Sequence, residues 1–231
     1  MGLATLGLLA VAATSAFVTV AVGRPDPRPA PAAAPAVPTT TTATVPPAEP
    51  APTASVPAPA STVRGTVSNG RHDGDLRFFL LPIPEGGESY GPADGIPVTD
   101  EDMAEQISGG AEIMTALRAF GYKDAATRTY RTKDGKAEVT VTLLRFTTAA
   151  RAGEFARSYT MDLPSVEIVG DPAAHGYVRK PKQQAYTGST SGISSQGDVQ
   201  YIIDVDMKGD PDKALLNDVM KRQRDWLISG R

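Results

Sequence analysis

The 231-residue chain contains no cysteine, and this absence excludes several kinds of chemistry. A chain without thiols forms no disulfide bond and has no cysteine nucleophile. It also has no cysteine-based zinc or iron–sulfur site and no lipid-modified cysteine of the bacterial lipoprotein type. Any attachment to a membrane would therefore have to use a helix.

Clustered positive charge is also scarce. The chain carries 23 Lys and Arg against 26 Asp and Glu, a formal net charge of −3. Nucleic-acid binding depends on basic clusters that displace counterions from phosphates. The densest basic stretches, 179–182 and 221–224, are short and have acidic or polar neighbours. We interpret both as solvated faces and expect no nucleic-acid partner.

Histidine occurs only twice, as His72 and His175, each in a polar or glycine-containing stretch. Neither has a second ligand at a metal-binding spacing, such as another histidine four residues further on. We therefore expect both histidines to be solvated. The sequence predicts no metal ligand, no cofactor-binding residue and no catalytic residue.

Residues 3–22 form a long run of uncharged, mostly apolar residues. A helix of about 20 residues spans about 30 Å of hydrocarbon, so this run is long enough to cross a membrane. A second interpretation is a signal peptide cleaved near Gly23, where the small residues suit signal peptidase. We assign residues 1–23 to a transmembrane anchor or a signal peptide, and both interpretations stay open.

Residues 24–70 are predicted to form a disordered linker. The stretch from Pro25 to Pro59 holds 12 of the chain's 20 prolines, and Ala and Thr make up much of the rest. Proline removes backbone donors and fixes φ, while Ala and Thr bring little apolar area, so extended polyproline II conformers are expected. Such a spacer would hold a domain away from a membrane or pass through a cell wall.

The orientation of the apolar run rests on two opposing observations. Arg24 and Arg28 follow the run and no basic residue precedes it, which by the positive-inside rule favours a cytoplasmic C-terminus. The linker and the separate domain after it favour export, and we give them more weight. We expect the C-terminal domain to lie outside the cytoplasm, either on a single-pass anchor in the cell membrane or secreted after cleavage near Gly23.

Residues 71–231 are predicted to form the folded domain. The apolar run 76–83 predicts a buried strand. Thr99, followed by three acidic residues, predicts the start of a helix that ends near Gly121. Gly109-Gly110 interrupts the apolar face of that helix, so we expect a bend or two half-helices.

Two hairpins follow, each leading into a helix. A turn at Asp134-Gly135 predicts three cross-strand pairs: Arg131 with Glu138, Tyr130 with Val139, and Thr129 with Thr140. A second turn at residues 196–198 joins strands 188–194 and 199–207. Alternation along the latter strand places Tyr201, Ile203 and Val205 inward and Ile202, Asp204 and Asp206 outward.

The two helices after these hairpins also have predicted starts. Thr147 or Thr148 caps the first, and Asp210 with Pro211 begins the second. The predicted fold class is α+β: an antiparallel sheet of about five or six strands built from hairpins, with about three helices packed on one face. Because the two hairpin–helix units match at an offset of 62 residues, we also expect an internal repeat.

Two short motifs resemble functional loops. Asp204-x-Asp206 with Gly209 begins like a calcium-binding EF-hand loop, but Lys208 and Leu215 stand where oxygen ligands are needed. Residues 188–192 resemble the nucleophile elbow of serine hydrolases, but the central residue is threonine in a predicted strand. We expect ordinary strand residues in both places, with the small residues of 188–192 approached by a helix or a ligand.

The segment from Arg145-Phe146 through Thr147-Thr148 to the helix with Ala152 and Phe155, behind an apolar segment and a Pro/Thr-rich linker, resembles uncharacterised extracytoplasmic domains of actinobacteria. More distantly it is similar to the sensor domains of their receptor serine/threonine kinases, although it lacks the cysteines that those domains commonly pair. The resemblance implies a ligand-sensing or envelope-associated role.

The sequence therefore predicts a non-catalytic, membrane-tethered binding or sensing module of the cell envelope, whose partners are the membrane and an unidentified ligand or envelope protein. The alternative is a secreted or tethered hydrolase of the cell envelope. A pocket that holds His72 or His175 beside a carboxylate and a hydroxyl would favour the hydrolase.

Overall fold

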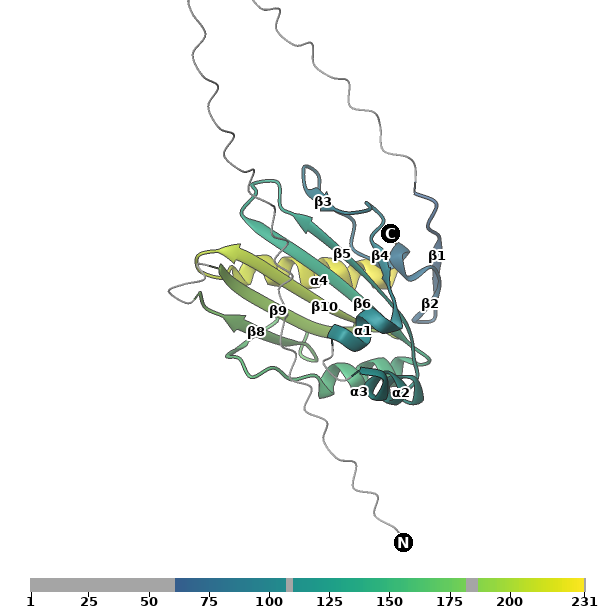
Figure 1. Ribbon diagram of the computed structural model, residues 1–231. Coiled ribbons are helices and arrows are strands. Elements are labelled where there is room, and N and C mark those ends of the chain that lie inside the picture. Colours follow the sequence, from purple (N-terminus) through teal and green to yellow (C-terminus); the bar gives the residue numbers. More distant parts are fainter. Residues whose placement is uncertain (1–60, 107–109, 182–186, 231) are drawn as a thin grey trace, which may run out of the picture. The chain divides into compact units, whose positions relative to one another are not determined.

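A large antiparallel sheet organises the part of the chain that the computed structural model describes, residues 61–106, 110–181 and 187–230 (Figure 1). The sheet has eight strands in the order β3-β5-β6-β10-β9-β8-β7, and β4 pairs with β5 beside β3. The strands are β3 (Glu88–Tyr90), β4 (Ile96–Val98), β5 (Tyr122–Arg131), β6 (Ala137–Phe146), β7 (Ser165–Val166), β8 (His175–Arg179), β9 (Thr187–Gln196) and β10 (Val199–Lys208). A separate hairpin, β1 (Gly65–Ser68) and β2 (Arg71–Gly74), precedes them.

Four α-helices and one 3-10 turn complete the fold of the described residues. They are η1 (Leu76–Phe79), α1 (Asp100–Gln106), α2 (Gly110–Phe120), α3 (Ala149–Ser158) and α4 (Lys213–Ser229). The α+β class and the large antiparallel sheet are confirmed. The predicted anchor at 3–22 and most of the linker lie outside the described residues. Within the described ranges, no helix has the length and apolar character needed to cross a membrane.

Local signals in the sequence set the hairpins and most helix ends as predicted. The start of α4 is an exception: Asp212, not Asp210, is its cap, because the Asp212 carboxylate accepts from the amides of Ala214 and Leu215. The register of β5 and β6 pairs Arg131 with Glu138 and Thr129 with Thr140. Thr99 caps α1 reciprocally: its hydroxyl accepts from the Asp102 amide, and its own amide donates to the Asp102 carboxylate. The predicted long helix is two helices, α1 and α2, and the second ends at Gly121 with φ +105°.

The predicted strand at 76–83 is wrong, because side chains, not another strand, satisfy its backbone. Residues 76–79 form η1. The buried amide of Gln223 accepts from the Leu81 amide (2.8 Å) and donates to the Phe79 carbonyl (2.9 Å). Arg128 donates to the Leu81 carbonyl at 2.7 Å. The apolar side chains of the run still enter the core, with Phe79 fully buried.

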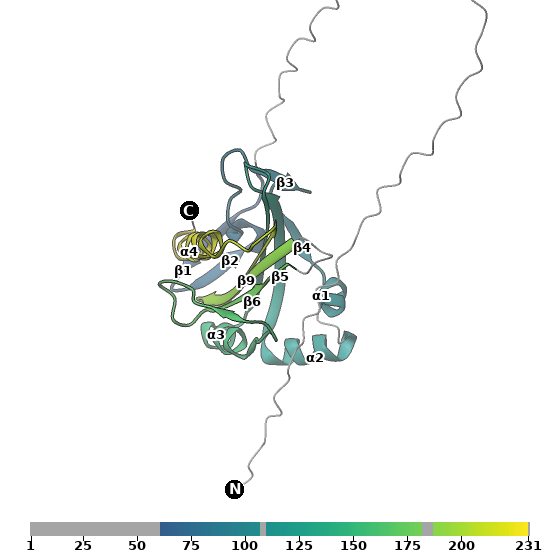
Figure 2. The same ribbon diagram turned by 90° about the vertical axis from the view of Figure 1, so that its left-hand side faces the viewer.

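Helices cover both faces of the sheet, not one as predicted. Alternate residues of β9 show the division: a Cβ on Gly192 would meet Met220 of α4, whereas Ile193 packs with Ala156 of α3. The helices α1 and α2 share the α3 side, where Met103 and Leu117 pack with Leu144 of β6. Figure 2 shows the sheet between α4 and α1.

The expected repeat of two hairpin–helix units holds for the hairpins but not for the helices that follow them. Val141 and Ile203, which match at the offset of 62 residues, lie directly opposite each other on β6 and β10 and both face α4. The helices that follow them, α3 and α4, pack on opposite faces of the sheet, so the hairpin–helix units do not superpose as wholes.

The folded part begins before residue 71, where composition placed the end of the linker. Strand β1 starts at Gly65 and pairs with β2 along its whole length. Residues 65–70 therefore belong to the hairpin, and the turn of that hairpin at Asn69-Gly70 packs against the turn between β9 and β10.

Candidate functional site

His72 is buried and hydrogen-bonded, not solvated as the sequence predicted. Only 1% of the residue is exposed. Its Nδ1 lies 2.7 Å from Asp198 Oδ1 and its Nε2 lies 2.8 Å from the Leu227 carbonyl oxygen near the end of α4. Both ring nitrogens therefore face oxygen atoms from distant parts of the chain. The prediction failed because both partners are more than 100 residues away in the chain.

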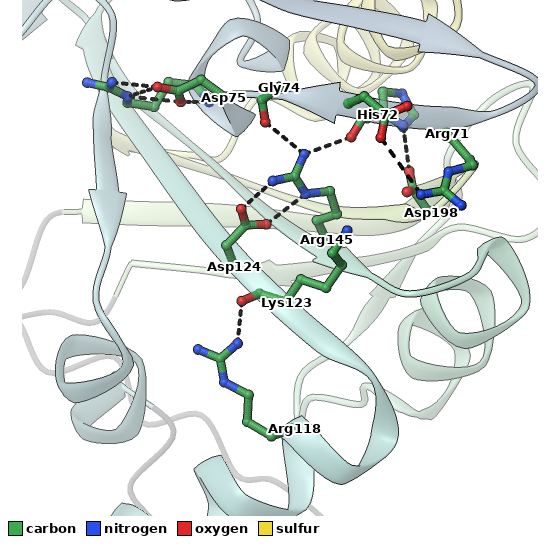
Figure 3. A network of polar contacts seen from close by, with 11 residues as sticks. Arg71, His72, Gly74, Asp75, Arg118, Lys123, Asp124, Arg145 and Asp198 are labelled. Carbon is green, nitrogen blue, oxygen red and sulfur yellow. Dashed lines mark hydrogen bonds and ion pairs between the residues drawn. The ribbon is translucent and has the colours of Figure 1, made fainter.

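A wider polar network joins the β1–β2 hairpin to the end of the sheet (Figure 3). The buried Arg145 donates to the carbonyls of His72 (2.7 Å) and Gly74 (2.9 Å) and to the Asp124 carboxylate (2.8 Å). The Asp198 amide donates to the Gly70 carbonyl at 3.0 Å. Gly197 allows this contact, because a Cβ there would overlap the Gly70 carbonyl oxygen.

This network holds the fold together and does not form a catalytic dyad. A general base must reach the proton it removes. The Nε2 of His72 faces a backbone carbonyl, and its ring stacks edge-on against Phe79 at 4.8 Å. Among the described residues no hydroxyl or thiol is bonded to either ring nitrogen.

His175 lies elsewhere, half-buried at the start of β8 and opposite Ile193 of β9. Neither histidine lines the shallow depression between α4 and the loop at 168–171. The polar groups of that depression already have protein partners: Asp171 accepts from Ser194 (2.8 Å) and Tyr201 (3.3 Å), and Lys221 pairs with Asp225. The depression is therefore a packed contact, and it does not have the composition of a hydrolase pocket.

The two sequence motifs are strand residues, as expected. Asp204 and Asp206 lie in β10, whose extended backbone cannot wrap a calcium ion. Across the described ranges no group of three His, Cys, Asp or Glu side chains is arranged to hold a metal ion. Residues 188–192 lie within β9, where a Cβ on Gly192 would lie 2.6 Å from Met220 Sδ, so the small residues let α4 pack closely.

The α1–α3 side of the sheet carries polar side chains at the end away from these helices. We call this surface the polar face and define it by two rows of cross-strand neighbours. The first row is Tyr177, Ser191, Asp204, Thr140, Thr129 and Tyr90. The second row, one step nearer the β5–β6 turn, is Arg179, Ser189, Asp206, Glu138, Arg131 and Glu88.

Solvent reaches much of the polar face. Glu138, Arg131 and Glu88 are exposed, Asp206 is half-buried, and Tyr90 is 43% exposed. On the same side of the sheet, Ile193 and Ile202 of the next row toward the helices pack with Ala156 of α3, beside the half-buried hydroxyls of Thr142 and Thr127. Tyr177, at one end of the first row, is buried in the same cluster, so the helical cover extends to that end of the polar face.

Burial perturbs the two aspartates of this face. Burial, with repulsion from Asp206 as a smaller contribution, raises the pKa of Asp204 to about 6, and the hydrogen bond from the Ser191 hydroxyl (2.5 Å) opposes the rise. Burial and repulsion from Glu138 likewise raise the pKa of Asp206. Neither carboxylate has an ion-pair partner among the described residues. Perturbed carboxylates on an accessible surface mark a candidate functional site.

Sequence reasoning found parts of the polar face but not its extent. The pairs Thr129–Thr140 and Arg131–Glu138 followed from the first hairpin. The joining of β6 to β10, which brings Glu138 opposite Asp206, is a long-range pairing that no local pattern in the sequence indicates.

Comparisons with known proteins give a distant structural similarity. No family model matches the chain, and no curated protein matches it by sequence. Among solved structures, the chain is similar to the extracellular domain of PknH from Mycobacterium tuberculosis, with a TM-score of 0.40 and 10% sequence identity, over 62% of this chain and 81% of that one.

Proposed function

We propose that the chain is a non-catalytic binding or sensing module of the cell envelope, held outside the cytoplasm by its N-terminal segment, and that the polar face is its recognition surface. The observation that carries the proposal is the partly exposed group of carboxylates, hydroxyls and arginines on a sheet face whose other end is covered by helices.

The polar face contains arrangements that cost folding free energy. Glu138 and Asp206 are directly opposite each other on adjacent antiparallel strands, and like charges in that position are destabilising. Asp204 is a half-buried carboxylate whose pKa is raised by burial, and attraction to Arg179 offsets only part of that cost. Residues that weaken the fold in this way are typically retained where a binding function uses them.

The hairpin that follows the linker leaves the polar face free. Strand β1 lies beside the end of α4, where a Cβ on Gly230 would be 3.3 Å from Val67 (Figure 2). Since α4 and the polar face are on opposite sides of the sheet, the described chain begins on the side of the domain away from the polar face.

The hydrolase alternative has no support in the site. His72, the histidine that lies beside a carboxylate, has its Nε2 bonded to the Leu227 carbonyl. His175 lies in the strand next to β9, and its cross-strand partner is Ile193.

Co-sedimentation with the insoluble cell-wall fraction of the source organism tests the proposal. The full chain is compared with Asp206→Arg on the polar face and with Asp218→Arg, which reverses an exposed charge on α4. We expect wild type and Asp218→Arg to sediment with the wall and Asp206→Arg to remain in solution. Equal sedimentation of all three, or of none, would contradict the proposed recognition surface.

Reporter fusions at the C-terminus test the localisation. A phosphatase that is active only after export should be active when fused after Arg231, and a reporter that is active only in the cytoplasm should not. Activity of the cytoplasmic reporter alone would overturn the extracytoplasmic assignment and the sensing role together.

A further inference from the structure

We propose that the polar face binds an uncharged, polyhydroxylated ligand, that is, a neutral oligosaccharide. This inference rests on the proposed function and adds the chemical class of the ligand. It is carried by the order of charges across the sheet, by the hydroxyl groups beside them and by an exposed tyrosine at one end.

The second row contains charges of both signs, in an order that suits neither a polyanion nor a polycation. Arg179 stands near one end, Asp206 and Glu138 lie in the middle, and Arg131 and Glu88 follow at the other end. A polyanion would meet the two central carboxylates and a polycation would meet the arginines. A ligand hydroxyl both donates and accepts, so it can pair with every member of this row.

The first row adds hydroxyl groups with unused hydrogen-bonding capacity. Thr129 Oγ1 and Thr140 Oγ1 are 3.0 Å apart and share one hydrogen bond. Each hydroxyl has one donor and two acceptor positions, so the pair can still make further bonds. Adjacent strands lie about 4.8 Å apart, and residues two positions apart along a strand are separated by about 7 Å. The face is thus a closely spaced lattice of donors and acceptors that suits a ligand with many hydroxyls.

Tyr90 supplies an apolar surface at the edge of this lattice. Its ring is partly exposed, and the Arg131 guanidinium lies 5.3 Å from the ring centroid. Aromatic rings that combine an apolar body with a polar tip suit ligands that also have both characters. The C–H surfaces of a sugar ring can pack on Tyr90 while its hydroxyls reach Thr129 and Arg131.

Calorimetric titration of the full chain in mild detergent tests the ligand class. The neutral probes are chitohexaose and a linear arabinan oligosaccharide. The charged probes are the fully deacetylated, cationic form of chitohexaose and an anionic oligogalacturonate. We expect a neutral probe to bind at least ten-fold more tightly than either charged probe.

Matched variants place the binding on the polar face. Thr129→Val with Thr140→Val removes two hydroxyls at nearly constant volume and should weaken binding at least ten-fold. Thr66→Val, an exposed position on β1, should leave binding unchanged. An unaltered thermal unfolding midpoint shows that each variant is folded.

Three results would overturn the inference, and they separate it from the proposed function. Tighter binding of a charged probe, abolished by the double variant, would keep the polar face as a recognition surface and refute the neutral ligand. If no probe binds but sedimentation with the wall still depends on Asp206, the oligosaccharide is refuted and the proposed recognition surface stands. Binding of a neutral probe that the double variant does not change would refute the location.

Discussion

Replacing Asp204 by asparagine should stabilise the domain at neutral pH. The pKa of this carboxyl is raised from 3.8 to about 6 chiefly by burial, so folding favours its protonated form. The stability that this preference contributes is fully present below about pH 3.8 and is lost as the pH rises through about 6. Above that window, the buried charge costs at most ~3 kcal/mol. Asparagine keeps the oxygen that accepts from Ser191 but carries no charge.

We expect Asp204→Asn to gain about 1–2 kcal/mol at pH 7, less than the full cost of the charge, because the polar amide of asparagine also loses solvation at this site. For a domain of this size, each kcal/mol raises Tm by roughly 2–4 °C. Urea and thermal unfolding of wild type and variant between pH 3.5 and pH 7 measure the difference, and Asp218→Asn on the exposed side of α4 is the control. A variant no more stable than wild type at pH 7, or a gain of the same size at pH 3.5, would refute the reasoning.

Three further predictions concern the hairpin and its neighbours. Gly197→Ala should destabilise the domain by about 2–4 kcal/mol in urea unfolding, since its φ is +58° and a Cβ would overlap the Gly70 carbonyl. A variant as stable as wild type would contradict the close contact between Gly197 and the turn of the β1–β2 hairpin. Gln223→Leu should cost about 2–4 kcal/mol, because it leaves the Leu81 amide and the Phe79 carbonyl buried without partners, and a loss below about 1 kcal/mol would argue against these bonds. Limited proteolysis of the full chain should yield a resistant fragment that retains β1, identified by N-terminal sequencing, whereas a stable fragment that begins after β2 would show that the hairpin is dispensable.

Local patterns in the sequence predicted the elements whose partners lie close in the chain. The Asp134-Gly135 turn fixed the register of β5 and β6, and Thr99 with its following acids marked the start of α1. The run 76–83 failed because its hydrogen-bond partners are the side chains of Gln223 and Arg128, which no periodicity in the run reveals. Its apolar character predicted burial correctly but not backbone conformation.

The sequence also did not predict which helix covers which face of the sheet. Alternation along β10 separates Ile203 from Ile202, but both are apolar, and only the folded chain shows that one meets α4 and the other α3. Asp204 was expected to point into solvent as an ordinary strand carboxylate. It lies on the predicted side of β10, yet burial there raises its pKa.

The two edges of the sheet are built from very short strands. On one edge β3 and β4 have three residues each, with Pro97 inside β4, and on the other edge β7 has two residues. Long, regular edge strands present unpaired backbone groups to which a second chain can add, and short edge strands that contain proline prevent this addition. If many copies are anchored side by side in one membrane, this edge construction would keep neighbouring sheets from joining into a continuous aggregate and leave each copy free to bind its own ligand.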